Sequence, residues 1–419
     1  MHPRTRVTVR MRQALLAVAM VSLHAGLWAQ PSPAPVVLGV KDLFDAAWAR
    51  QPEALALQAR RESVQAQRRA ASAWTPEPPA LEAATRTDRL TGNNGGRELE
   101  VGVVVPLWLP GERSGSSVLA DAEAAAVESR VEAARLRLAA AVREAWWSWQ
   151  RAGAEVEIAR AQLESVRQLA TDVGRRAKAG ELARADRHQA DGAVAAAEAS
   201  LAQSQAAATA ALQQMRALSG MAITTLRDAP ALPEPLPPSS GLPDHPALTE
   251  LQDRAIVAER SAELASAQSR ANPELLLATT RERASSTEAY QQTITLAVRI
   301  PFGGGSRYEG KVAKARADAA EAQAQLALDR AQLHSDREAA VARVEAVRVQ
   351  LAAAERRAAL ARETRGFFEK SFRLGETDLP TRLRIESEAT EAERQAARSR
   401  IELAAAISAW RQALGLLPQ

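Results

Sequence analysis

The sequence predicts a mainly helical, internally duplicated protein in which each copy combines long antiparallel coiled-coil helices with a β-hairpin. Three observations predict this fold class. Matched residues recur 195 positions apart, long segments carry apolar residues every seven positions, and four short segments alternate apolar with polar residues. A heptad pattern is typical of coiled coils, whereas a two-residue alternation is typical of strands with one apolar face.

The N-terminal segment, residues 1–29, has the pattern of a secretory signal peptide. Four arginines lie before residue 13, a nearly continuous apolar run covers Ala14–Leu27, and the expected cleavage point is near Ala29. We therefore expect export, and the alternative is a cytosolic chain with an amphipathic N-terminus. Removing those four arginines leaves 50 of the 54 basic residues, which equals the 50 acidic residues, so no nucleic-acid partner is expected.

The repeated residues define two copies of one unit. A first repeat is expected over 30–228 and a second over 244–419, with a proline-rich connector at 229–243. The composition of this connector favours an extended chain over a helix or a strand. The pairs that share the spacing of 195 residues include Pro106 and Pro301, Gly115 and Gly310, Gly180 and Gly375, and Gly220 and Gly415.

Each repeat opens with a helical segment and continues with a hairpin of two strands. The helices are expected at Leu43–Ala73 and Leu248–Ala271, because a proline follows shortly after each. Leu81 and Leu276 occupy matched positions in the first strand of the two hairpins. The four strands are expected at Ala80–Asp88, Glu98–Trp108, Glu274–Glu282 and Thr293–Phe302.

The second strand of each hairpin carries one continuous apolar row. Its members are Leu99, Val101, Val103, Val105, Ile294, Leu296, Val298 and Ile300. Such strands suit a barrel wall whose apolar face meets lipid, since membrane β-strands have about 9–11 residues. Four strands cannot close a barrel, because the smallest barrels have about eight, so this interpretation requires several chains. The alternative is two soluble hairpins that pack their apolar faces on a core.

After each hairpin, heptad rows predict a very long helix and a shorter returning one. The rows cover Val131–Ala177 in the first repeat and Val344–Phe372 in the second. A helix over Ser114–Lys178 would be about 95 Å long at roughly 1.5 Å per residue, longer than a globular core requires. The returning helices are expected at Asp186–Leu218 and Thr381–Leu414.

No group of residues predicts an enzyme, a metal site or a bound cofactor. The chain has no Cys, which excludes disulfides and thiolate ligands, and its five His are scattered. Gly303–Gly305 lacks the spacing and the lysine of a phosphate-binding loop, and His188 is a lone histidine on a helix. Trp146, Trp147 and Trp149 are expected in the helical core rather than in a ligand-stacking box, because Trp149 lies on a heptad row.

With these features in this order, the chain resembles the TolC family of outer-membrane efflux ducts. It is most similar to the short CzcC-like members, which are associated with heavy-metal efflux. The resemblance implies a homotrimer whose strands form a twelve-stranded barrel in outer-membrane lipid and whose helices continue as a tunnel through the periplasm. The segments that carry it are AKAGELARADRHQAD at 177–191, NPELLLATTRERA at 272–284, LAVRIPFGGGSRYEG at 296–310 and FRLGETDLPTRLRIESE at 372–388.

The resemblance also implies that the two glycine turns form a periplasmic tip, which docks on a periplasmic adaptor protein of an inner-membrane pump. Leu182, Leu374 and Leu379 are expected to be exposed there, because the heptad rows do not cover them. Family members can narrow the entrance with acidic residues, but this chain has Thr381 and Arg384 instead. A simpler alternative is that both glycines only cap helices. The candidate docking residues are Gly180, Glu181, Leu182, Asp186, Leu374, Gly375, Glu376 and Leu379.

Other functions remain open at this point. A periplasmic adaptor also has long helical hairpins, and a coiled-coil scaffold would explain the heptads, but neither explains the duplicated β-hairpins. For a duct, heavy-metal cations are the expected cargo, with drug efflux and type I secretion as alternatives. A duct need not bind what it passes, so the sequence of the duct carries little information about cargo.

Overall fold

The computed structural model describes residues 39–222, 233–238, 240, 244–302 and 305–419, which all belong to one compact unit, residues 37–419. The expected signal peptide, Gly303, Gly304 and part of the connector lie outside the described residues. The described elements are α1 (Val40–Trp48), α2 (Pro52–Ala71), β1 (Ala80–Thr87), β2 (Arg97–Pro106), α3 (Glu112–Ala179), α4 (Arg184–Ser219), α5 (Pro246–Ala267), β3 (Glu274–Arg283), β4 (Gln291–Arg299), α6 (Gly305–Leu374) and α7 (Leu379–Ala413). None of the described helices combines the length and the apolar composition that a membrane-crossing helix needs.

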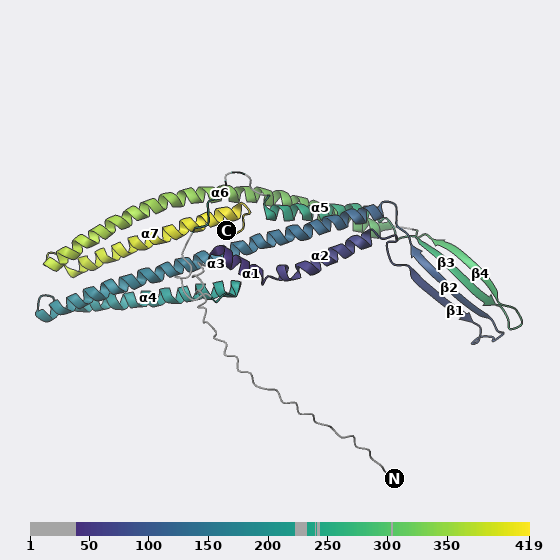
Figure 1. Ribbon diagram of the computed structural model, residues 1–419, viewed down its shortest axis with the longest axis horizontal. Helices are drawn as coiled ribbons and strands as arrows, with labels where there is room; N and C mark the ends of the chain where they lie inside the picture. Colours follow the sequence, from purple (N-terminus) through teal and green to yellow (C-terminus); the bar gives the residue numbers. More distant parts are fainter. Residues whose placement is uncertain (1–38, 223–232, 239, 241–243, 303–304) are drawn as a thin grey trace, which may run out of the picture. The chain divides into compact units, whose positions relative to one another are not determined.

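The chain turns back after each long helix, and the shorter helix that follows packs along it (Figure 1). The long helices α3 and α6 have 68 and 70 residues, and they pack along α4 and α7. The heptad rows are confirmed as buried seams, since Val142 and Val173 of α3 are 0% exposed and Val344 of α6 is 1% exposed. Side chains repeated every seven residues keep one side of each helix against its partner over this length.

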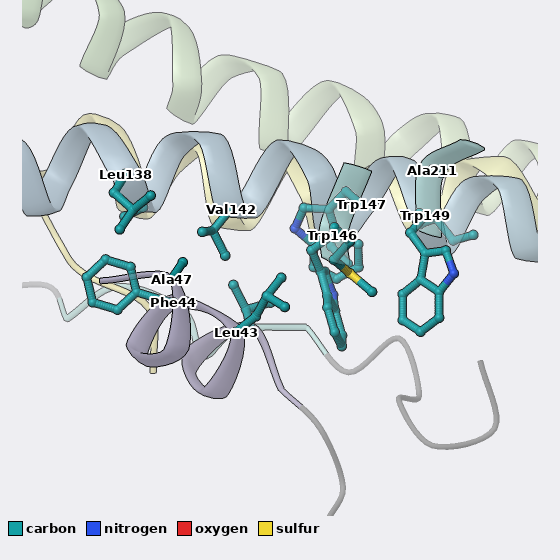
Figure 2. Packing of buried hydrophobic residues seen from close by; sticks show 14 residues of the cluster. Leu43, Phe44, Ala47, Leu138, Val142, Trp146, Trp147, Trp149 and Ala211 are labelled. Carbon is teal, nitrogen blue, oxygen red and sulfur yellow. The ribbon is translucent and has the colours of Figure 1, made fainter. Parts of the chain in front are cut away.

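The largest hydrophobic cluster lies where α1 meets α3 (Figure 2). Leu43 of α1 points toward α3 beside Trp146. The expected core position of the three tryptophans is confirmed, because Trp146, Trp147 and Trp149 are at most 3% exposed. Trp147 Nε1 donates a hydrogen bond of 2.9 Å to Ser408 Oγ, so the cluster also fixes α7 of the second repeat.

The first helical segment is interrupted, whereas a continuous helix was expected over Leu43–Ala73. Residues 49–51 separate α1 from α2, and Pro52 is the first residue of α2. Proline lacks an amide hydrogen and its ring clashes with the preceding helical turn, so a helix starts at proline more readily than it continues through it. The break lets α1 pack in the tryptophan cluster while α2 leads to β1.

A buried ionic cluster fixes the connector residue Glu234. Its carboxylate lies 2.8 Å from the guanidinium of Arg143 in α3 and 3.4 Å from that of Arg411 in α7. Burial lowers the pKa of Arg411, and the charge of Glu234 opposes this shift. Arg411 also donates a hydrogen bond of 3.0 Å to the Pro235 carbonyl. The connector is therefore tied to helices of both repeats.

The four strands form one antiparallel sheet in the order β1-β2-β3-β4. The pairing of β2 with β3 joins the hairpin of the first repeat to that of the second. Strands β1 and β4 form the two edges, and neither has a second strand partner among the described residues. The sheet is therefore open within one chain.

Candidate functional sites: the outer sheet face and the helix tips

One side of the sheet, here called the outer face, is apolar and exposed. Directly paired residues of antiparallel strands share a face, so Val103 lies beside Leu81 and Leu277, and Leu277 lies beside Leu296. The exposed apolar side chains of this face are Leu81, Leu99, Val101, Val103, Leu277, Ile294, Leu296 and Val298. Their exposed fractions reach 78%, so no other described part of the chain covers this face.

Three residues of the strands differ from the expected apolar rows. Leu276 was expected to match Leu81, but it lies on the inner face opposite Val104. The counterpart of Leu81 opposite Val103 is Leu275 opposite Val298, and a shift of one residue reverses the face. Ile300 lies beyond Arg299, the last residue of β4, since Pro301 has no amide hydrogen to extend the ladder. Val105 lies in β2 as expected but is half-buried.

The other side, here called the inner face, carries small and polar residues. Gly102 is buried on this face, and a Cβ atom there would lie only 2.9 Å from the Cβ of Ala278. Glycine is therefore required for the close approach of β2 and β3. Glu100, Thr280 and Thr295 also lie on the inner face. Val104 and Leu276 are apolar partners at the helix end of this face. The sheet thus separates a mainly apolar surface from one that is mainly small and polar.

Aromatic residues mark the end of the outer face that is nearer the helices. Trp74, between α2 and β1, is 93% exposed, and Phe302, after β4, is 92% exposed. Trp108 follows β2, and its Nε1 donates a hydrogen bond of 3.2 Å to the Ala73 carbonyl. Exposed aromatic side chains at the edge of an apolar band are typical of a membrane–water boundary.

The two helix-hairpin tips have the same backbone turn. Gly180 and Gly375 adopt positive φ angles of 85° and 78°, a conformation that favours glycine. Glu181 N donates to the Arg176 carbonyl at 3.0 Å, and Glu376 N donates to the Ser371 carbonyl at 3.0 Å. This hydrogen bond, together with one from each glycine, makes a Schellman motif that ends the long helix. Capping is therefore one role of both glycines.

The two shorter helices begin with different aspartate caps. In the first tip, Asp186 Oδ2 accepts a hydrogen bond of 3.0 Å from Ala183 N. In the second, Asp378 Oδ1 accepts one of 3.1 Å from Thr381 N. Hydrogen bonds from Thr381 lower the pKa of Asp378, because they stabilise the carboxylate. Asp186, a candidate docking residue, therefore also has a structural role.

The structure corrects the expected exposure of the tip leucines. Leu379 is only 1% exposed, because it packs with Val173 of α3 and Phe372 of α6 where the two hairpin tips meet. Leu182 is half-buried at the edge of this cluster. Leu374 alone of the three is well exposed, at 75%. Glu181 and Glu376 are also exposed.

Arg176, which sequence reasoning missed, joins the two tips. From α3, its Nη1 and Nη2 donate to the Phe372 and Arg373 carbonyls at 3.1 and 3.3 Å. These carbonyls lie at the C-terminal end of α6, where a cation interacts favourably with the helix dipole. A basic residue in the last turn of α3 indicated only an interaction with the C-terminal end of its own helix. Nothing in the sequence indicated a contact with the other hairpin.

Among the residues that the structure describes, no group of three or more His, Asp or Glu side chains could hold a metal ion. His188 is exposed on α4, and Asp186 of the same helix is engaged in its cap. The outer sheet face and the tips are two exposed surfaces of the described residues.

Comparison with known proteins supports this arrangement. The family model described as outer membrane efflux protein matches residues 43–221. Among solved structures, the chain is similar to VceC of Vibrio cholerae (20% identity over 90% of this chain and 96% of that chain, TM-score 0.72). It is also similar to CusC, with 16% identity over 93% of this chain and 96% of that chain and a TM-score of 0.73. A third similar structure is the Neisseria gonorrhoeae MtrE outer membrane channel, with 17% identity over 93% of each chain and a TM-score of 0.69. These identities show a shared fold, and no match was found among curated proteins.

Proposed function

We propose that the whole chain is an outer-membrane efflux protein, since residues 43–221 match that family and the complete fold is that of outer-membrane channels. Three copies form a duct whose sheets cross the outer membrane and whose helices lie in the periplasm. The observation that carries this proposal is the outer face of the sheet. It exposes an apolar surface, and the opposite, inner face carries mainly small and polar residues.

The open edges of the sheet call for further copies of the chain. In a bilayer core, unpaired backbone groups are costly, so a membrane sheet must close on itself. Strand β1 of one copy would then pair with β4 of the next. Four strands per chain and a minimum of about eight strands require at least two copies. The family resemblance favours three.

Helix α6 carries a second apolar stripe that supports packing between copies. Its buried seam against α7 includes Val344 and Ala358. A second heptad row consists of Ala346, Ala353, Leu360 and Phe367, and all four are exposed. The two rows differ by two residues in register, which places them on opposite sides of the helix. A neighbouring copy would cover the exposed row.

The tips would dock on a periplasmic adaptor of an inner-membrane pump. Leu374 and the half-buried Leu182 offer apolar contact, and Glu181 and Glu376 offer charge. Leu379 is left out of this contact, because its side chain is buried between the hairpins. A docking surface of this kind needs exposed apolar anchors with a polar rim.

Heavy-metal cations are the proposed cargo, and the resemblance of the sequence to CzcC-like members is the support for them. The test is the resistance of a strain that lacks this chain but keeps its pump. Restoring the chain should restore resistance to zinc, cobalt or cadmium salts. Restored resistance to organic drugs alone would assign the duct to drug efflux instead.

Cysteine cross-linking tests the closed sheet, and the natural chain has no Cys to interfere. Ala84→Cys in β1 would be combined in turn with Thr293→Cys, Thr295→Cys and Ala297→Cys in β4, all on the inner face. At least one combination should give a disulfide-linked trimer in outer-membrane fractions, and the single variants should not. If every combination leaves the chains unlinked, β1 and β4 do not pair between copies.

A further inference from the structure

The outer face changes from apolar to cationic toward the loops that join the strands of each hairpin. One row across the sheet holds Val101, Thr279 and Ile294. The next row toward the loops holds Leu99, Arg281 and Gln292, and the last holds Thr87, Arg97 and Arg283. Three arginines therefore lie on the apolar side of the sheet, and all three are at its loop end.

Two of these arginines oppose each other directly. Arg97 and Arg283 are register partners on β2 and β3, and like charges in this position destabilise a sheet. Arg97 is compensated, because its Nη1 lies 2.9 Å from Asp88 Oδ1. Among the described residues, no carboxylate forms an ion pair with Arg283 or with Arg281. An anion from outside the chain would relieve this repulsion.

Tyr290 holds the two uncompensated guanidiniums together. The ring of Tyr290 lies 4.6 Å from the guanidinium carbon of Arg281 and 4.8 Å from that of Arg283. Arg283 Nε also donates a hydrogen bond of 3.1 Å to the Gly95 carbonyl. Stacking on an aromatic ring reduces the freedom of a guanidinium while leaving its edge available to an oxyanion.

The position of the cluster indicates what kind of anion it meets. From Phe302, at the helix end of the outer face, to Gln292 in the row of Arg281 there are ten residues. At about 3.3 Å per residue this is roughly 33 Å along the chain, or roughly 25 Å along the membrane normal for a strand tilted by about 35–45°, which matches the height of a membrane apolar band. The arginines would thus lie at the level of lipid headgroups.

We propose that Arg281 and Arg283, positioned by Tyr290, bind a phosphate group of a lipid headgroup in the outer leaflet. The inference rests on the proposed function, since it requires the outer face to contact lipid. Guanidinium pairs bind phosphate oxygens through charge-assisted hydrogen bonds. Continuity with the apolar rows favours a lipid phosphate over free phosphate, because the acyl chains would cover Ile294 and Leu296.

The test uses the full chain, purified from outer membranes and reconstituted into phosphatidylcholine vesicles. The vesicles contain either diphosphoryl lipid A or the same glycolipid without its phosphates, and native mass spectrometry counts the lipid retained after detergent extraction. The wild-type protein should retain the phosphorylated form at least about ten-fold better, the effect expected for one charge-assisted hydrogen bond. This preference is measurable without any variant.

Variants then locate the site. Arg281→Gln with Arg283→Gln should abolish the preference. The control, Arg86→Gln with Arg299→Gln, removes the same charge from the inner face and should keep the preference for the phosphorylated form. Equal retention of the two glycolipids by wild type, or a preference that survives the outer-face variant, would overturn the proposal.

Two further results separate the possible failures. If inorganic phosphate binds through Arg281 and Arg283 in calorimetry while the glycolipid is not retained, the ligand is a free anion and the lipid site is rejected. If the protein inserts into phosphate-free vesicles but shows no preference, only the headgroup site fails. If it inserts into neither kind of vesicle, the proposed membrane function fails as well.

Discussion

Leu296 and Thr295 are neighbours on β4 whose side chains lie on opposite faces of the sheet. We predict that Leu296→Arg costs roughly 2–4 kcal/mol of membrane stability, since it places a charge in the apolar band. Thr295→Arg should be tolerated, because that side chain lies on the polar inner face. Outer-membrane fractionation and urea unfolding in vesicles measure both effects. Equal tolerance of the two changes would reject the assignment of the faces.

Among the described residues, Glu234 is the one carboxylate that pairs with the buried guanidiniums of Arg143 and Arg411. Glu234→Gln would leave the charges of Arg143 and Arg411 uncompensated. Removing one partner of a buried ion pair lowers the free energy of unfolding by about 3–5 kcal/mol. Thermal unfolding of the purified protein measures the loss. Glu250→Gln is the control, because it breaks a more exposed pair with Arg137 and should cost at most about 1 kcal/mol. Similar losses for both would show that burial does not matter here.

Asp378 makes the second tip sensitive to acid. Hydrogen bonds from Thr381 hold the pKa of this carboxyl below its ordinary value. Its contribution to stability is therefore complete above the unfolded pKa of about 3.9, and it is lost as pH falls through the lower folded pKa. Amide exchange at the start of α7, corrected for intrinsic rates, should accelerate in that range. Asp378→Asn keeps an acceptor without titration and should remove this pH dependence.

At the scale of elements, the periodic segments were predictable from the sequence and the breaks were less so. The heptad rows predicted α3 and α6 because every apolar position repeats one packing geometry. The α1–α2 break was missed although Pro52 was visible, since the apolar residues continue through it. Leu379 was expected to be exposed, because a heptad row describes the packing of one hairpin and not the contact between two.

The tips allow a matched test of docking. Leu374→Asp changes an exposed side chain, so the fold should keep its stability within about 0.5 kcal/mol while cross-linking to the adaptor is lost. Leu379→Asp places a charge in the cluster between the hairpins and should cost more than about 3 kcal/mol. Cross-linking and unfolding measured on both variants separate contact from folding. Unchanged cross-linking of Leu374→Asp would contradict the docking surface.

At the scale of the whole molecule, the exposed row of α6 predicts where copies meet. Leu360→Glu with Phe367→Glu should abolish the proposed trimer but leave α6 packed on α7, because the buried seam is on the opposite side of the helix. Ala359→Glu adds charge at an exposed position outside this row and should leave the trimer intact. The mass of each purified variant, measured by light scattering in detergent, shows whether it is a trimer. A trimer in the double variant would exclude this row from the interface.

The arrangement of the two repeats was predictable because the duplication fixed the element order. The contacts that hold the repeats together were not, since they join residues with no shared pattern. Arg143 and Arg411 are far apart in sequence, and Glu234 lies in a connector whose composition indicated only an extended chain. Arg176 crosses from one tip to the other in the same way. Such contacts depend on tertiary geometry, which periodicity does not encode.

The spacing between the two hairpins is not constant along the chain. Val103 and Val298 are 195 residues apart, whereas their outer-face partners Leu81 and Leu275 are 194 apart. The second hairpin therefore has one residue fewer before β3 and one more between its paired positions, so the two differences cancel at β4. Because side chains alternate between the faces, a one-residue change inside a strand would move its apolar row to the inner face. A change of length in a segment between strands leaves every apolar row in place.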